Sequence, residues 1–228
     1  MDYAGLPARV ASVRETIARH QAVGGWSHPV AIIAVTKTHG PEAVRAAWAA
    51  GLRMVGENRV QEAVQKMPAV SDVPVEWHLI GSLQRNKVKQ VIGRFELFHA
   101  LDRVELAEEF ARRMPPGASQ RVLVEVNCSG ESQKAGVEPD ALPALLDAVD
   151  RFPGLQVEGL MTMAPLTSDA DIQRATFRRL RECRDEAERR GRGLPELSMG
   201  MSGDFPVAVE EGATMIRLGT ILFGERAQ

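Results

Sequence analysis

A lysine stands two residues after the first strongly apolar run of the chain. Lys37 follows the segment VAIIAV at residues 30–35 and shares the alternating face of Ile33 and Val35. An amine held among apolar side chains loses solvation, which lowers its pKa and makes it a nucleophile toward a carbonyl group. A lysine that simply reaches from a strand end to water has the same spacing. The position of Lys37 therefore permits Schiff-base chemistry without establishing it.

Glycine and small hydroxyl residues gather near the C-terminal end of the chain. The segments SMGMSGDF (198–205) and RLGT (217–220) place Ser202 and Thr220 next to Gly203 and Gly219. Glycine lets backbone N–H groups approach an anion closely, and hydroxyl groups add further donors. Tight turns between strands and helices use the same residue types. The pattern thus indicates either a phosphate site or turn geometry.

A single arginine shares the face of this glycine pattern. Arg217 alternates in step with Met215 and Gly219. If that face is buried, the guanidinium needs an acceptor, which is either a protein carboxylate such as Glu57 or a ligand atom. An amine, an anion cradle and a cation together suit a phosphorylated aldehyde held as an imine. Pyridoxal 5′-phosphate (PLP) and a phosphorylated sugar in a Schiff-base aldolase both remain open at this point.

The elements that must position these groups are read from hydrophobic periodicity. Eight short apolar runs are expected to be strands, at residues 30–35, 53–56, 75–80, 97–101, 122–126, 157–161, 197–199 with its flanks, and 215–218. Helical patterns lie before and between them, at residues 9–22, 42–50, 60–67, 87–92, 104–113, 141–149, 172–190 and 205–210. Strands that alternate with helices predict a parallel sheet.

Eight such units in roughly 200 residues fit a (β/α)₈ TIM barrel of the α/β class better than an open sheet. One domain is expected over residues 1–228, with a leading helix within 1–29 and the barrel within 30–226. Functional groups of such barrels come from the C-terminal ends of the strands. The residues at those ends are mostly polar, and they occupy positions 36–39, 57–58, 81–82, 102, 127, 162–163, 202–204 and 219–220.

Composition excludes several classes of protein. The chain has 228 residues, with 28 basic and 30 acidic residues and a pI near 6.2, so it lacks the basic excess of nucleic-acid-binding proteins. Arginines at 177–192 alternate with acidic residues, as on a solvated helix face. No apolar run approaches the roughly 18 residues of a membrane span, and the start lacks a signal peptide core, so we expect a cytoplasmic protein.

The two cysteines, Cys128 and Cys183, are too few for a disulfide framework and lack the spacing of a zinc or redox motif. The simplest interpretation is that both are small buried apolar residues. We therefore expect neither a metal site nor a membrane or nucleic-acid partner.

Several longer segments, taken in order, resemble one known family. They are AVTKTHG (34–40), VGENRVQE (55–62), WHLIGSLQRNK (77–87), VEVNCSGESQKAG (124–136), GLMTMAP (159–165) and the stretch 197–224. They resemble the pyridoxal phosphate homeostasis proteins, single-domain PLP-binding barrels that are similar to the N-terminal barrel domain of alanine racemase. The sequence differs slightly from the family pattern at Thr36, where serine is common, and at QKAG (133–136), where SKxG is common.

The resemblance implies PLP as cofactor and a set of site residues. By position, Lys37 would form the Schiff base and Arg217 would face the pyridine nitrogen. The remaining expected contacts are Ser202, Gly219 and Thr220 around the phosphate, Asn58 beside the ring, and the backbone of Met201. The family implies intracellular PLP homeostasis, in which the protein holds PLP and buffers it or delivers it to apo PLP enzymes.

Catalysis by the protein itself is not expected. An arginine against the pyridine nitrogen disfavours ring protonation, which restricts carbanion chemistry. A two-base racemase also needs a second acid–base group, usually a tyrosine on another domain, whereas the single tyrosine here is Tyr3. His39 and His78 are weaker candidates, and we expect His78 to be a packed strand residue. We therefore expect a monomeric carrier without catalytic residues; the alternative is a PLP-dependent racemase or decarboxylase with weak activity.

Overall fold

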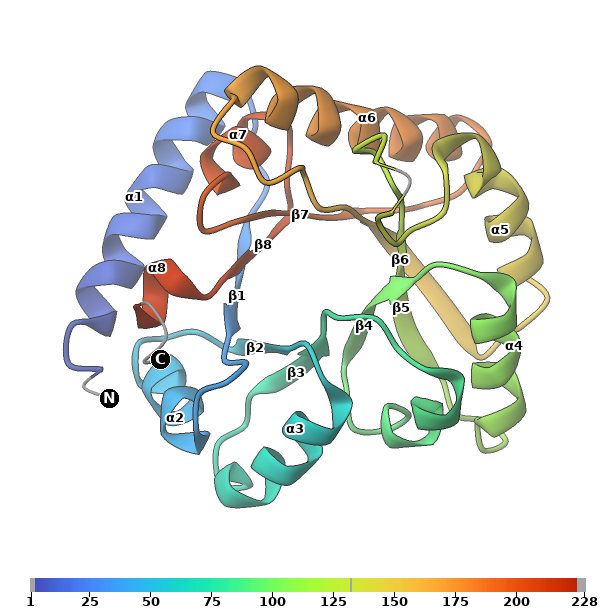
Figure 1. Ribbon diagram of the computed structural model, residues 1–228, viewed down its shortest axis with the longest axis horizontal. Coiled ribbons are helices and arrows are strands. Elements are labelled where there is room, and N and C mark those ends of the chain that lie inside the picture. The colour runs from blue at the N-terminus through green and yellow to red at the C-terminus, as the bar shows by residue number, and fades with distance from the viewer. Residues whose placement is uncertain (1–2, 132, 225–228) are drawn as a thin grey trace.

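The computed structural model describes residues 3–131 and 133–224, so the expected end of the barrel at residue 226 lies outside them. Within these residues eight strands form a closed barrel, and every neighbouring pair that is hydrogen-bonded is parallel (Figure 1). The strands are β1 (Ala31–Val35), β2 (Met54–Glu57), β3 (Glu76–Leu79), β4 (Leu97–Leu101), β5 (Gln120–Glu125), β6 (Leu155–Met161), β7 (Glu196–Met201) and β8 (Met215–Leu218). The expectation of a (β/α)₈ barrel is confirmed.

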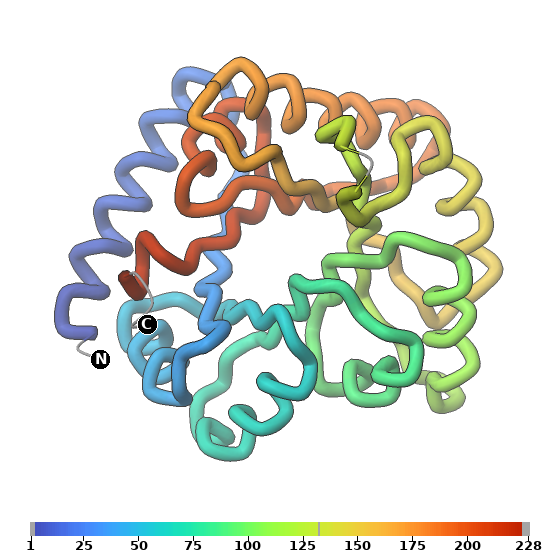
Figure 2. The backbone as a smooth tube through the Cα atoms, in the orientation of Figure 1, coloured from blue at the N-terminus to red at the C-terminus, as the bar shows by residue number. Residues whose placement is uncertain are grey.

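Helices surround the barrel, and the chain runs once around it so that β8 returns to β1 (Figure 2). The α-helices are α1 (Leu6–Gly24), α2 (Pro41–Ala49), α3 (Val60–Lys66), α4 (Val104–Arg113), α5 (Leu142–Val149), α6 (Ala170–Arg189), α7 (Phe205–Glu210) and α8 (Thr220–Phe223). Within the described ranges there are also three 3₁₀ helices, namely η1 (Met67–Val70), η2 (Arg85–Gln90) and η3 (Pro139–Ala141).

The helix expected at 87–92 differs in kind from the prediction. The structure has the 3₁₀ helix η2 there, and Lys87 N–H donates to the Gln84 carbonyl three residues earlier. Val88 and Val91 are both buried and lie three residues apart. A 3₁₀ helix places residues at this spacing directly above one another, so it buries both valines with one short turn.

Local chemistry marks where several helices begin and end. Pro41 occupies the first turn of α2, where its missing N–H costs nothing, and Gly51 follows the helix with φ of 81°. Asp169 caps α6, because its side chain accepts hydrogen bonds from the N–H groups of Asp171 and Ile172. These boundaries leave short loops after β1 and β6, and those loops carry residues of the barrel mouth.

The apolar core has an inner layer within the barrel and an outer layer between strands and helices. All five residues of β4 are buried, as a strand covered on both faces requires, and the rings of Phe98 and Phe110 on α4 pack with centroids 5.6 Å apart. The leading helix α1 packs on α7 and α8 beside the β8–β1 junction (Figure 1). There Arg9 Nε donates to the Leu222 carbonyl at 2.6 Å.

The arginines of α6 form ion pairs, as the charge pattern predicted. Arg190 pairs with Glu186 at 2.8 Å, four residues earlier on the same helix. Arg174 and Arg181 reach across to Glu211, the residue that follows α7, and the Arg181 pair is 2.6 Å long. These pairs neutralise the helix face and fix α6 against α7. Among the described residues, no helix combines the length and the apolar character that a membrane crossing requires.

Candidate functional site

A cavity of about 560 Å³ opens at the C-terminal ends of the strands. Strands from opposite sides of the ring contribute to its wall, because the C-terminal ends of all parallel strands meet at one edge of a barrel. The lining includes all seven residues that the sequence singled out: Lys37, Asn58, Met201, Ser202, Arg217, Gly219 and Thr220. The structure therefore brings the amine, the cation and the glycine–hydroxyl segments into one site.

The backbone on both sides of Lys37 is held by hydrogen bonds. Thr36 is fully buried, its N–H donates to the Gly56 carbonyl at 3.0 Å, and its hydroxyl donates to Glu57 at 2.6 Å. On the other side, Thr38 adopts a left-handed conformation with φ of 67°, and its N–H donates to a Glu62 carboxylate oxygen at 2.5 Å. Lys37 thus projects from a fixed turn at the cavity wall.

A buried ion pair between Lys66 and Glu57 holds the turn that carries Lys37. Lys66 Nζ lies 2.5 Å from Glu57 Oε1 and donates to the Thr36 carbonyl at 2.9 Å. Burial raises the pKa of Glu57, and the hydrogen bonds from Lys66 and Thr36 oppose that rise. Of the two acceptors that the sequence leaves open for Arg217, Glu57 is not the one in the structure, because Lys66 on α3 bonds this carboxylate. Sequence spacing showed Lys66 only as one residue of an amphipathic helix.

Arg217 is buried inside the barrel and donates to neutral acceptors. Its Nη1 lies 2.8 Å from the Ser198 carbonyl and 2.7 Å from the Ser198 hydroxyl, and its Nη2 lies 2.9 Å from the Thr162 carbonyl. Burial lowers the pKa of Arg217 to about 10, so the guanidinium remains charged at neutral pH. No acceptor among the described residues bonds its Nε–H, which leaves a donor for a ligand at the cavity wall.

A chain of hydrogen bonds continues from Arg217 through the barrel interior. The Ser198 hydroxyl lies 2.9 Å from His99 Nδ1, and His99 Nε2 lies 2.9 Å from His78 Nδ1. His78 is therefore a packed, hydrogen-bonded strand residue, as expected. Burial holds the pKa of His99 well below its usual value, with smaller effects of the same sign from His78 and Arg217. His99 is consequently a neutral imidazole.

This chain of contacts begins at a donor of known direction. Arg217 can only donate, so the Ser198 hydroxyl accepts from it. The donor and the acceptor in the two contacts of His99, with Ser198 and with His78, depend on which ring nitrogen carries the proton. At the other end of the barrel, His78 Nε2 lies 4.0 Å from a Glu76 carboxylate oxygen. The chain therefore orients Arg217.

The loops after β7 and β8 form the glycine–hydroxyl side of the cavity. The Ser202 hydroxyl accepts the Ile221 N–H at 3.3 Å, which joins the two loops. The space where a Gly203 side chain would lie is open. The Met201 N–H donates to Asp204 at 2.5 Å, so the amide contact that we expected from Met201 is already used within the loop. Two hydroxyls and flexible glycine backbone at one wall suit a phosphate group.

The position of Asn58 depends on a glycine in the neighbouring loop. A side chain at Gly81 would place its Cβ only 2.3 Å from the Asn58 carbonyl oxygen. Glycine therefore allows the segments after β2 and β3 to touch, and both residues line the cavity. This contact holds Asn58 at the wall, beside the space that Lys37 also faces.

Glu125, at the end of β5, is a cavity residue that the sequence reasoning missed. It is 3% exposed, and burial raises its pKa to about 7, with Asp102 acting in the same direction and Arg217 opposing. At neutral pH this carboxyl is therefore partly protonated and able to give or take a proton. The signal was present, since a carboxylate in the apolar run VLVEV shares a face with Leu123.

Replacing Glu125 by glutamine should change how stability depends on pH. The pKa of Glu125 rises from 4.5 to about 7 on folding, so the folded protein binds this proton more tightly, and stability falls as pH rises through that window. Above it, ionised Glu125 costs about 3 kcal/mol. In urea unfolding at several pH values, the free energy of unfolding of Glu125→Gln should rise relative to that of the native protein as the pH increases from 4.5 to about 7. As a control, Glu105→Gln at an exposed site should leave the dependence of stability on pH unaltered. If Glu125→Gln and the native protein had parallel stability–pH profiles, the assignment would be contradicted.

Tyr3 and His39 lie near the cavity without lining it. The Tyr3 hydroxyl is 3.4 Å from His39 Nδ1, and the Tyr3 ring packs edge-on against Phe223 of α8. Within the described part of the chain, the cavity wall contains neither residue. Tyr3 is thus placed as part of the packing between the chain start and the C-terminal helix.

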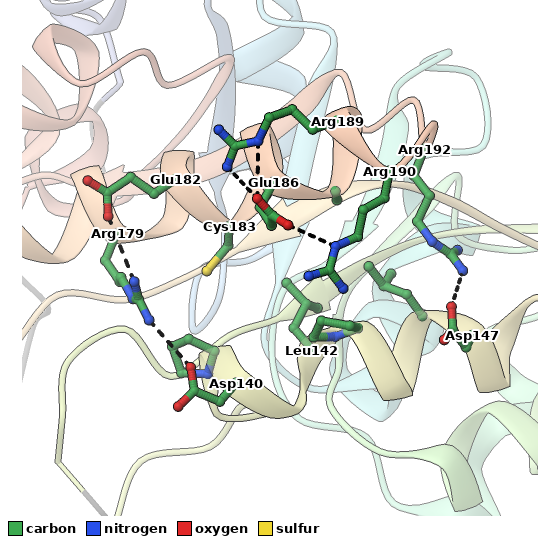
Figure 3. A pocket seen from close by; sticks show the side chains of 14 residues that line it. Asp140, Leu142, Asp147, Arg179, Glu182, Cys183, Glu186, Arg189, Arg190 and Arg192 are labelled. Atoms are coloured by element: carbon green, nitrogen blue, oxygen red, sulfur yellow. Dashed lines mark hydrogen bonds and ion pairs between the residues drawn. The ribbon is translucent and has the colours of Figure 1, made fainter.

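A second groove, of about 670 Å³, lies outside the barrel between α5 and α6 (Figure 3). Its arginines pair with neighbouring carboxylates; for example, Arg192 lies 2.5 Å from Asp147 and Arg190 lies 2.8 Å from Glu186. No lysine is among the described residues that line it. Although this groove is larger, the amine and the anion-binding groups lie in the cavity at the barrel mouth, which is therefore the candidate functional site.

Comparison with known proteins agrees with this geometry. The family model described as alanine racemase, N-terminal domain, matches residues 11–227. The pyridoxal phosphate homeostasis protein of Aquifex aeolicus is 45% identical over 221 residues, which cover 96% of this chain and 97% of the relative. The protein of the same name from Pseudomonas aeruginosa is 43% identical, with 90% and 89% covered.

A solved structure shows the same arrangement of the chain. PipY of Synechococcus elongatus, solved with PLP bound, superposes with a TM-score of 0.85 at 39% identity, and the match covers 96% of this chain and 100% of PipY. Near-complete coverage at such identity, together with a barrel whose mouth holds the expected residues, leads to one assignment. The chain belongs to the family of pyridoxal phosphate homeostasis proteins, which is built on the alanine racemase N-terminal barrel.

Proposed function

We propose that this protein binds PLP at the barrel mouth and serves intracellular PLP homeostasis, holding the cofactor as a Schiff base for buffering or delivery. One observation carries the proposal: a single cavity contains an amine, a charged guanidinium with a donor to spare, and two hydroxyls on glycine-rich loops. The names of the relatives and the PLP-bound structure of PipY support it.

Each group of the cavity has a counterpart in the cofactor. PLP supplies an aldehyde that condenses with an amine, and Lys37 is the amine at the wall. The loop of Ser202 and the segment of Gly219 and Thr220 would hold the phosphate, and Arg217 would donate to the pyridine nitrogen. Asn58 would lie beside the ring, and Met201, whose amide is already bonded, would contact the cofactor through its exposed side chain.

Lys37 is better placed for this role than its buried neighbour Lys66. The Lys66 amine is bonded both to the Glu57 carboxylate and to the Thr36 carbonyl, and its side chain is 5% exposed. Lys37 lines the cavity, whereas Lys66 is not among the described residues that line it. Lys66 instead holds the turn that presents Lys37, so one lysine serves as support and the other as the reacting group.

We further propose that the protein carries PLP without turning over amino acids. PLP acts as an electron sink when its ring nitrogen is protonated, and a permanently charged Arg217 beside that nitrogen disfavours the second positive charge. The Ser198 hydroxyl and the carbonyls of Ser198 and Thr162 orient the guanidinium, and a pKa of about 10 leaves it charged at neutral pH. Apo PLP enzymes are the recipients that such a carrier would serve.

Borohydride reduction of the PLP-loaded protein tests the binding mode. The reduced pyridoxyl group should be found on Lys37 by peptide mass spectrometry, because that amine faces the cavity. An adduct on any other lysine would overturn the assignment. The same loaded protein, incubated with a panel of amino acids, should racemise and decarboxylate them no faster than free PLP does. Faster turnover would show that the protein is an enzyme.

A further inference from the structure

Glu125 is the one acidic residue among the described residues that line the cavity at the barrel mouth. Three basic side chains, those of Lys37, Arg59 and Arg217, lie in the same wall. Glu125 is 3% exposed, and no described residue donates a hydrogen bond to its carboxyl group. A buried polar group normally has a hydrogen-bond partner. An open carboxyl group at the wall of a ligand cavity therefore indicates that its partner arrives with a ligand.

The nearest cation does not supply that partner. The charge of Arg217 lowers the pKa of Glu125, yet the three hydrogen bonds of this guanidinium go to neutral groups. The acceptors are the Ser198 carbonyl, the Ser198 hydroxyl and the Thr162 carbonyl. Arg217 is thus held away from the carboxyl group by its own bonds, and Glu125 keeps its acceptor oxygens for another donor.

The other titratable groups around Glu125 also leave it without a counter-ion. On the neighbouring strand β4, His99 is a neutral imidazole bonded within the barrel, and Asp102 after that strand raises the pKa of Glu125 through its like charge. The other neighbour, β6, adds no described titratable residue to the wall. Lys37 and Arg59 share the wall, but neither forms an ion pair with Glu125.

Delivery of a bound aldehyde creates a need for such a group. The cofactor passes to another amine only if that amine is neutral, whereas a lysine-type amine has a pKa of about 10.4 and arrives protonated. Arginines cannot take its proton, and hydroxyl groups are very weak bases. A carboxyl group with a pKa of about 7 is partly ionised at neutral pH, so Glu125 can attract the ammonium and accept its proton.

We propose that Glu125 is the proton acceptor for the primary amine that displaces Lys37 when the cofactor is passed on; this inference rests on the proposed function. The incoming ammonium pairs with the Glu125 carboxylate. Its N–H bond breaks as an O–H bond forms on Glu125, and the nitrogen keeps the electron pair with which it takes the place of Lys37. The released Lys37 amine then takes up one proton, and Glu125 returns to the carboxylate, so protons and charge balance.

Two small amines of different charge test this role. Methylamine is protonated at neutral pH, whereas methoxyamine is neutral there and needs no proton acceptor. Each is added to the PLP-loaded protein, and quenching with borohydride at timed intervals gives the fraction of cofactor still on the chain. In Glu125→Gln, release by methylamine should be about a hundredfold slower than in the native protein, and release by methoxyamine should be unchanged. Equal slowing with both amines, or with neither, would overturn the proposal.

The dependence of the methylamine rate on pH is a readout that a merely structural role would not move. In the native protein the rate should rise with pH up to about 7 and then level off, because Glu125 is then ionised and the amine still protonated. In Glu125→Gln it should rise about tenfold per pH unit up to about pH 9, following the free amine. The same profile in both proteins would contradict proton transfer to Glu125. Glu105→Gln, at an exposed site on α4, should behave like the native protein.

The protein without PLP gives an independent measurement. Carbon-13 NMR of the Glu125 carboxyl group should show that methylammonium lowers its pKa, because a cation beside a carboxylate favours the ionised form. An unchanged pKa would refute the role of Glu125. This titration reports on Glu125 even if no pyridoxyl group is found on Lys37, a result that would refute the proposed function instead.

Discussion

Replacing Lys37 by alanine abolishes the imine absorbance of the PLP-loaded protein and lowers its affinity for PLP about a hundredfold. The variant loses the amine that faces the cavity, whereas the cation and the hydroxyls remain in place. Retained noncovalent contacts keep some binding. Because Lys37 is half-buried and Thr36 and Thr38 hold the turn through their own bonds, the fold should survive the change. Absorbance titration and equilibrium dialysis give the two quantities.

A matched lysine variant controls for the loss of a positive charge. Lys89 is exposed on η2, away from the cavity wall, and Lys89→Ala should bind PLP like the native protein. Thermal unfolding of both variants checks that neither has lost its structure. An undiminished imine band in Lys37→Ala would mean that another amine holds the cofactor, and the proposed binding mode would fail.

Replacing Arg217 by methionine has the second large effect. The change removes the donor of three buried hydrogen bonds; the Ser198 carbonyl keeps the Thr162 N–H as a partner, whereas the Thr162 carbonyl and the Ser198 hydroxyl lose the guanidinium. Each unpaired buried acceptor is expensive, so the free energy of unfolding should fall by about 3 kcal/mol. PLP affinity should fall about tenfold, because one charged donor to the cofactor is lost. Denaturant unfolding and dialysis measure the two effects independently.

Conservative variants show whether Arg217 acts through its oriented charge. Arg217→Lys keeps a charge but cannot reach Ser198 and Thr162 together, so it should bind PLP with intermediate affinity. Ser198→Ala keeps Arg217 and breaks the chain to His99; the nitrogen-15 chemical shift of His99 Nδ1 should then change, because Nδ1 loses its hydroxyl partner. If Arg217→Met were as stable and bound PLP as tightly as the native protein, the role of Arg217 would be refuted.

Much of the fold was predictable because the signals for it are local. The alternation of apolar runs and amphipathic helices indicated eight parallel strands, and β4, β8, α4 and α7 begin and end at the expected residues. Once a barrel is expected, strand ends must meet at one edge, so residues as distant as Lys37 and Thr220 were expected in one place. The structure places both at the wall of one cavity.

The features that the sequence did not predict are those that depend on which side chains contact one another in the fold. The partner of Glu57 is Lys66 and not Arg217, because the first turns after β1 and β2 pack on α3. The raised pKa of Glu125 depends on burial by neighbouring strands, which spacing alone does not quantify.

The sequence by itself thus determined the barrel, the edge of the barrel that carries the chemistry, and the residue types there, since periodicity and strand order are properties of the chain. Only the tertiary structure decided which ionisable groups are buried together. Partner choice and pKa depend on distances and desolvation between residues far apart in sequence. For that reason the supporting Lys66 and the partly protonated Glu125 became visible only in the folded protein.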